Sequence, residues 1–257
     1  MTQTTQRPSR RAAAIDAARA RALARTPMQS VIHGAVQSTP FLLVIVPFGL
    51  LFGVVATKAG FNLAEVMGFT VLVLAGASQF TAVQLMTDHA PVWLVILSSL
   101  AVNLRMAMYS ASLAPHIGAA PLWQRALIAY LMVDQAYATS ILRYEQQPGL
   151  SLPAKVAYYF GVVSLICPVW YLGTLAGALV GNQIPESVPI GAAVPIAFIA
   201  LIGPMLRTLA HVGAALVSVV LALALAWIPY NLGLLVAALA AMAAGALIET
   251  WQQGRSA

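Results

Sequence analysis

Arg105 and Asp134 are the residues whose types and positions most readily suggest chemistry, because each is a charge inside an otherwise apolar stretch. Arg105 lies in "AVNLRMAMYSASLAP" and Asp134 in "AYLMVDQAYATS". An unpaired charge in hydrocarbon costs several kcal/mol. The two stretches predict neighbouring antiparallel helices that place both charges at similar depth, so we expect an ion pair. Snorkelling of Arg105 to a headgroup would need a helix that stops near residue 105, and the sequence beyond it stays largely apolar.

An intramembrane ion pair either fixes helix packing or marks a substrate or proton path. We favour the path, because desolvating two charges roughly cancels their attraction and makes a poor stability device. Asn103, Gln135 and Tyr137 are candidate supporting groups. Asn103 and Arg105 are two residues apart, so on a regular helix they point in different directions. That helix is therefore expected to be surrounded by protein or interrupted.

Two further stretches have the composition of a discontinuous helix. In "AGASQF", the candidates are Gly76, Ala77, Ser78 and Gln79. They predict either a tight helix contact or a break whose free N–H groups face an anionic substrate group. In "PFGLLFG", Pro47 removes one backbone bond, and Gly49 and Gly53 lower the cost of unwinding. There too a kinked but packed helix is the alternative.

The composition places these residues in a membrane protein. The 257 residues are 61% hydrophobic and 8% charged, against about a quarter charged in ordinary soluble domains. Although the net charge is +6, the basic residues lie mostly in the N-terminal tail and in loops, so membrane topology explains them without nucleic acid. The single cysteine, Cys167, excludes an internal disulfide and is interpreted as a packing residue.

The apolar runs predict an all-α, polytopic fold of about eight transmembrane helices, some discontinuous near mid-membrane. The expected helices span residues 38–58, 62–87, 91–114, 121–142, 154–180, 188–206, 208–227 and 231–249. Loss of the boundary at Arg207 would give seven. Three regions follow: a basic cytoplasmic tail (1–34), a transmembrane domain (35–250) and a short C-terminal tail (251–257). The positive-inside rule puts the N-terminus and Arg143 in the cytoplasm, and Lys58 and Arg125 outside.

The sequence offers no enzyme signature. His33, His89, His116 and His211 lack a metal-like spacing and are interpreted as interfacial or loop residues. A Walker A sequence and a phosphate-binding glycine loop are also missing from the sequence. We therefore expect neither a metal nor a cofactor, and no nucleotide hydrolysis by this chain.

The motifs "PFGLLFG", "AGASQFTAVQL", "NLRMAMYSASLAP" and "VDQAYA", in this order, resemble the AzlC family, the large subunits of bacterial branched-chain amino-acid exporters. The resemblance covers about residues 35–180, including "YLGTLAGALVG". It implies export of branched-chain amino acids, sometimes methionine, from the bacterial inner membrane together with a small AzlD-type subunit. Where the family commonly has Asp followed by Glu, this chain has Asp134 followed by Gln135, so no role that needs a second carboxylate carries over.

The resulting hypothesis is a proton-coupled secondary transporter, an antiporter for hydrophobic amino acids. Arg105 and the segment from Gly76 to Gln79 would hold the substrate carboxylate, and Asp134 would hold the ammonium group and couple protons. The predicted apolar lining is Phe48, Phe52 and Phe80. The alternatives are a passive pore for zwitterions or ions, with the charged pair as its constriction, and a membrane partner that does not itself transport.

Overall fold

The computed structural model describes residues 27–181, 183–185, 206, 208–228 and 232–256. All elements in these ranges are helical, as expected. The predicted helix 188–206 and most of the predicted N-terminal tail lie outside the described residues. The chain forms two compact units, one of Leu97–Ile184 with the described residues up to Ala82, and one of Val83–Ile96 with those from Pro185 onward.

Three helical stretches in the described residues are long and apolar enough to cross a membrane. The first, Pro27–Lys58, joins α2 (Pro27–Ser38), the short η1 (Thr39–Phe41) and α3 (Leu42–Lys58). The others are α6 (Val92–Ile117) and α9 (Leu152–Gly181). Because about 20 residues span the hydrocarbon core, the chain is a multi-helix membrane protein. α2 begins at Pro27, so the predicted tail boundary at residue 34 falls inside it.

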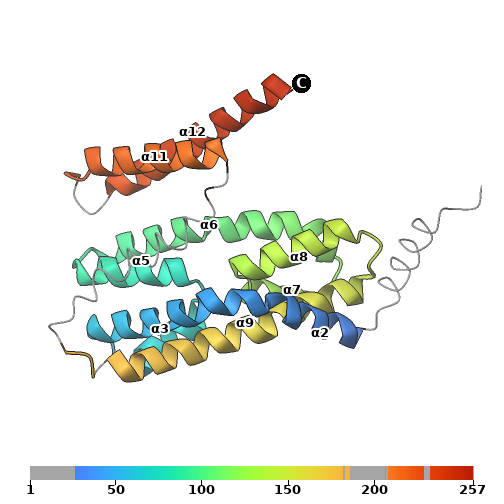
Figure 1. Cartoon of the computed structure of the whole chain (residues 1–257). Coiled ribbons are helices and arrows are strands. Elements are labelled where there is room, and N and C mark those ends of the chain that lie inside the picture. The colour runs from blue at the N-terminus through green and yellow to red at the C-terminus, as the bar shows by residue number, and fades with distance from the viewer. Residues whose placement is uncertain (1–26, 182, 186–205, 207, 229–231, 257) are drawn as a thin grey trace, which may run out of the picture. The chain divides into compact units, whose positions relative to one another are not determined.

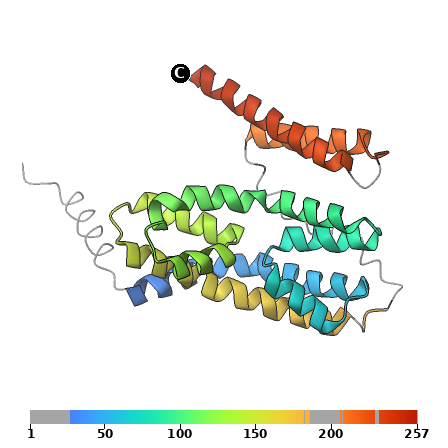
Figure 2. The same cartoon turned by 180° about the vertical axis from the view of Figure 1, so that it is seen from behind.

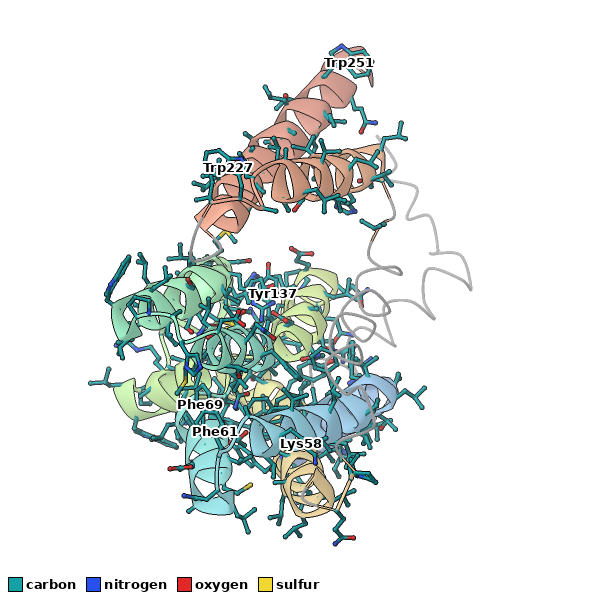
Figure 3. The ribbon with its side chains drawn as sticks, turned by 90° about the vertical axis from the view of Figure 1, so that its left-hand side faces the viewer. Lys58, Phe61, Phe69, Tyr137, Trp227 and Trp251 are labelled. Atoms are coloured by element: carbon teal, nitrogen blue, oxygen red, sulfur yellow. The ribbon has the colours of Figure 1, made fainter. Side chains whose placement is uncertain are left out.

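α3 and α9 lie side by side and run in the same direction (Figure 1). At their ends, Lys58 Nζ donates to the Ile184 carbonyl at 2.6 Å, and Figure 3 shows Lys58 beside α9. Glycines allow the two backbones to touch: a Cβ on Gly53 would lie 2.1 Å from the Thr174 oxygen, and one on Gly177 would lie 2.0 Å from the Leu50 oxygen. Small residues at such contacts are the usual device for helix association in lipid.

This packing corrects the expected break at Pro47, Gly49 and Gly53, because α3 continues as a helix through Pro47. Proline removes only one backbone bond, and both glycines are buried against α9. A Cβ on Gly49 would lie 3.2 Å from the Trp170 carbonyl oxygen. The alternative reading, a packed helix, therefore describes this segment.

The predicted helix 62–87 is instead a hairpin of two short helices, α4 (Leu63–Leu72) and α5 (Gly76–Thr87). Gln79 Nε2 donates to Thr70 Oγ1 at 2.9 Å across the turn at 73–75. Nine residues of continuous helix would separate the two residues by about 13 Å. The rings of Phe69 and Phe80 likewise both pack against Phe52, with centroids 6.1 and 5.4 Å away. The chain therefore turns back at this point.

The predicted helix 121–142 is a second hairpin, formed by α7 (Leu122–Tyr130) and α8 (Asp134–Gln146). α8 runs parallel to the second half of α6, since residue numbers rise together along their contacts. Arg105 meets Asp134, Tyr137 O–H donates to Ser112 Oγ at 3.1 Å, and the rings of Tyr144 and His116 lie 5.4 Å apart. The expectation of one antiparallel crossing helix was therefore wrong, because the chain reverses at 131–133.

The two hairpins start from opposite ends of α6 (Figures 1 and 2). Their tips meet where the Tyr130 hydroxyl donates to the Val71 carbonyl at 2.6 Å. Arms of 9 to 13 residues are too short to cross about 30 Å of hydrocarbon. Their geometry is that of re-entrant segments, whose irregular backbone is tolerated where protein covers it. Arg125, near the start of α7, then lies at the same end as Arg143, not at the opposite end as the sequence suggested.

In the second unit, α11 (Leu209–Ala224) and α12 (Leu232–Ser256) form an antiparallel pair. Thr208 caps α11 by accepting from the His211 N–H at 3.2 Å, so a helix does begin after Arg207. A Cβ on Gly213 would lie 2.4 Å from Ile248, which fixes the pairing. Trp227 and Trp251 lie toward opposite ends of this pair (Figure 3), as tryptophans do at the two membrane interfaces. α12 continues past the predicted boundary at residue 251.

Candidate functional site

The Arg105–Asp134 pair lies where the middle of α6 meets the tip of the second hairpin. Arg105 Nη1 and Asp134 Oδ2 are 3.1 Å apart, and their side chains are 29% and 42% exposed. Asp134 is the first residue of α8, so the positive end of that helix also favours its negative charge. The expected ion pair is therefore present, between parallel helices and not antiparallel ones. Its partial exposure keeps it within reach of a small ligand.

The ion pair leaves part of its hydrogen-bonding capacity unused. Within the described parts of the chain, the buried atoms Arg105 Nε, Asp134 Oδ1 and Asn103 Oδ1 have no hydrogen-bond partner. Buried polar groups usually have a partner, so the unused atoms of the ion pair are typical of a site that a ligand or water completes. One donor and one acceptor suit a group that both donates and accepts. The predicted site residue Asn103 also has an unpaired acceptor, but α6 is continuous here, so Asn103 and Arg105 point in different directions. Gln135 lies half-buried in the first turn of α8.

The tip of the first hairpin holds the predicted segment from Gly76 to Gln79. The break falls at 73–75, directly before Gly76, and Gln79 N–H donates to the Ala75 carbonyl as the first bond of α5. The N–H groups of Gly76, Ala77 and Ser78 therefore have no carbonyl partner within α5. Ser78 Oγ donates to the Ser99 carbonyl of α6 at 3.1 Å. Gln79 is fully buried and its Oε1 has no partner.

The three predicted phenylalanines come together in one aromatic cluster beside the first hairpin. Phe80 packs edge-on against both Phe48 and Phe52, with centroids 5.2 and 5.4 Å away. The cluster also includes Phe69 and Trp170, which the sequence did not single out. Trp170 stacks on Phe52 at 6.3 Å, and its ring leaves no room for a side chain at Gly76. Phe52 is fully buried, so in this state the cluster is a packed wall.

Tyrosine hydroxyl groups that the sequence did not single out donate hydrogen bonds near the tips of both hairpins. Tyr159 of α9 donates to the Ile128 carbonyl at 3.0 Å, near the end of α7. Tyr130, which bonds Val71, also contacts the Tyr171 hydroxyl at 3.2 Å. The last carbonyls of a helix lack partners within it, so these hydroxyls satisfy groups that lipid cannot. Nothing in the sequence pattern marks a tyrosine for this role.

The profile of the AzlC protein family matches residues 40–184, which include both hairpins, α6 and α9. The chain belongs to the AzlC family. The charged pair and both hairpin tips lie inside the matched region. The C-terminal pair α11 and α12 lies outside it.

Relatives of known sequence are membrane proteins. The inner membrane protein YgaZ of Escherichia coli is 26% identical over 159 residues, which cover 62% of this chain and 64% of the relative. An uncharacterized membrane protein of Helicobacter pylori is 27% identical over 52% of this chain and 57% of its own length. One from Archaeoglobus fulgidus is 28% identical over 85% of this chain and 93% of its own. The chain thus spans less than two thirds of the first two relatives. No solved structure matches.

Proposed function

We propose that this AzlC family protein is the large subunit of a secondary transporter that exports branched-chain amino acids in exchange for protons. The observation that carries the proposal is the Arg105–Asp134 ion pair, in which each side chain keeps a buried polar atom without a partner. Intramembrane charges more often mark a substrate or ion path than a stability device.

A zwitterionic amino acid can replace the internal ion pair. Its carboxylate would bind Arg105 and its ammonium group would bind Asp134, so both charges stay compensated when the pair opens. A ligand with only one of the two charges would leave the other residue unpaired, which is costly in a low-dielectric site. The arrangement therefore favours zwitterions over simple anions or cations.

The first hairpin would supply the apolar part of the site. Phe48 and Phe80 pack edge-on beside the α5 tip, and a branched aliphatic side chain could bind against such a wall. Because the cluster is closed in this state, binding requires the hairpin tip to move. A three-residue tip held by a few side-chain hydrogen bonds is a suitable element for such a movement.

Proton coupling would follow from Asp134. The carboxylate pairs with Arg105 or with the substrate ammonium group, whereas a protonated Asp134 holds neither by charge. A proton arriving from outside would thus release the substrate, and its loss to the cytoplasm would restore the ion pair seen here. In this cycle a proton and the substrate ammonium group would bind alternately to the Asp134 carboxylate.

The proposal includes a small AzlD-type membrane subunit and an inner-membrane location. The location follows the name of the Escherichia coli relative, an inner membrane protein. The subunit follows from the family, and α11 and α12 supply surfaces rich in small residues that suit tight helix contact. The protein would be multi-pass with its N-terminus in the cytoplasm, since Arg143 and Lys155 lie at the end where α2 begins.

Uptake by inverted membrane vesicles that contain both subunits tests this proposal. Labelled leucine, isoleucine, valine and methionine are supplied with and without a pH gradient, acid inside. We expect saturable uptake that the gradient stimulates and that Asp134→Asn abolishes. Unsaturable flux with ion conductance would instead show that the protein is a passive pore. If export persisted after deletion of this chain alone, the chain would be a membrane partner that does not itself transport.

A further inference from the structure

A row of polar side chains continues from the ion pair along the seam between α6 and α8. On α6 the row consists of Arg105, Tyr109, Ser112 and His116, spaced four, three and four residues apart. This spacing places them on one face of the helix. Because α8 runs parallel to α6, its residues Asp134, Tyr137 and Tyr144 meet successive members of this row. The row ends at His116, in the last turn of α6.

Contacts connect several members of this row. Tyr109 lies one turn beyond Arg105 on α6, close to Asp134. The rings of Tyr109 and Tyr137 stack with centroids 4.2 Å apart and planes 10° apart. Tyr137 O–H then donates to Ser112 Oγ at 3.1 Å, and Tyr137 is labelled in Figure 3. One turn further along α6 is His116.

We propose that this seam is the path by which a proton leaves Asp134 for the cytoplasmic end of α6, with His116 as the terminal acceptor. The inference deepens the proposed function and rests on it, because it assigns a route and residues to the proton release. His116 faces the end where Arg143 and Lys155 lie, which the positive-inside rule places in the cytoplasm.

Proton transfer along the seam needs no reactant other than water. The Asp134 O–H bond breaks and its proton passes to the Tyr109 oxygen, while Tyr109 gives up its own proton to the next acceptor. Tyr137 and Ser112 repeat this exchange, and water bridges the gaps between hydroxyl groups. His116 accepts the proton at its free ring nitrogen and then releases it to bulk water. The net result is one proton moved, with Asp134 left as the carboxylate that pairs with Arg105.

The charged and titratable neighbours support this direction. Asp134 faces Arg105 and Tyr109 from α6, with Tyr137 on its own helix. Arg105 stabilises the carboxylate once the proton has left. His116 faces Tyr144 of α8, whose ring lies under Lys155 Nζ at 5.7 Å.

The test separates proton release from substrate binding in the same inverted vesicles. Exchange is measured as entry of labelled leucine against internal unlabelled leucine, with a protonophore present, and needs no net proton movement. Coupled uptake is measured with the pH gradient. We expect His116→Gln to lower coupled uptake by about 100-fold, while exchange stays within about twofold of wild type.

His211→Gln on α11 is the matched control, because it removes an imidazole outside the seam and should alter neither assay. Ser112→Ala tests the same path by removing a single hydroxyl group. Equal loss of exchange and coupled uptake in His116→Gln would show that the seam only packs the helices. Unchanged coupled uptake in His116→Gln would place the path elsewhere. Failure of the wild type in both assays would overturn the proposed function itself, and the path with it.

Discussion

Tyr130 at the end of α7 donates its hydroxyl hydrogen to the carbonyl oxygen of Val71 in α4, at 2.6 Å, and so links the tips of two hairpins that enter from opposite ends. The bond satisfies a carbonyl near the interrupted end of α4, where the helix cannot do so itself. Because of this hydrogen bond, a movement of one tip would displace the other.

Tyr130→Phe should therefore loosen both tips. Loss of one hydrogen bond to a backbone carbonyl is expected to cost about 0.5–2 kcal/mol of stability, measured as a lower melting temperature in detergent. Tyr171→Phe is the matched control, because it removes the other hydroxyl of the contact and leaves the bond to Val71. Equal destabilisation by both variants would contradict the central role of Tyr130.

Gly53→Ala should separate α3 from α9. The new methyl group would lie 2.1 Å from the Thr174 carbonyl oxygen, so one helix has to shift. Overpacking of this kind costs about 1–3 kcal/mol. Gly68→Ala in α4 is the control, since nothing lies within 4 Å of its Cβ position, and alanine should stabilise that helix slightly. Melting curves of the two variants in one detergent make the comparison. If Gly53→Ala melted with or above Gly68→Ala, the close contact would be refuted.

The sequence identified the charges and the helices but not the two reversals. A charge inside an apolar stretch needs a partner, and this argument, with the similar depth of the two charges, predicted that Arg105 meets Asp134, although the antiparallel helices assumed for it were wrong. The turn Val73–Leu74–Ala75 is apolar and contains no glycine or proline, so hydropathy could not distinguish a hairpin from a crossing helix. Its reversal depends on tertiary contacts such as Gln79 with Thr70. Asp134 did carry a local signal, because aspartate is favoured at the start of a helix.

The hairpins also change the expected sidedness of two loops. In a background of Cys167→Ala, Asp88→Cys should react with an impermeant label from outside intact cells, whereas Ala119→Cys should be protected. Eight straight crossings predict the reverse for both positions. Gln183→Cys, expected outside, and Gln146→Cys, expected inside, serve as references because both topologies agree on them. Protection of Asp88→Cys together with labelling of Ala119→Cys would overturn the re-entrant hairpins.

The chain is expected to depend on a small helical membrane subunit. The segment "VAALAAMAAGALIE" of α12 is rich in small residues, and such surfaces associate tightly with other helices in lipid. Expressed alone, the chain should show lower yield and no leucine export compared with the two-subunit preparation. Export by the purified single chain at the rate of that preparation would show that no partner is needed.

Variants of Arg105 and Asp134 distinguish a functional role of this ion pair from a purely structural one. Arg105→Gln leaves Asp134 without its cation, and Asp134→Asn leaves Arg105 without its anion, so each should lower stability by about 1–3 kcal/mol. Partial exposure of both side chains keeps the loss at the lower end of this range. The double variant should recover most of the melting temperature, since a neutral pair avoids the desolvation cost. Coupled export should remain absent, because both charged contacts to the substrate are gone. Asp134→Asn alone should also remove the pH dependence of any residual transport, which vesicle uptake at several pH values measures. A double variant that exports at the wild-type rate with an unchanged pH profile would make the pair structural and move the site elsewhere.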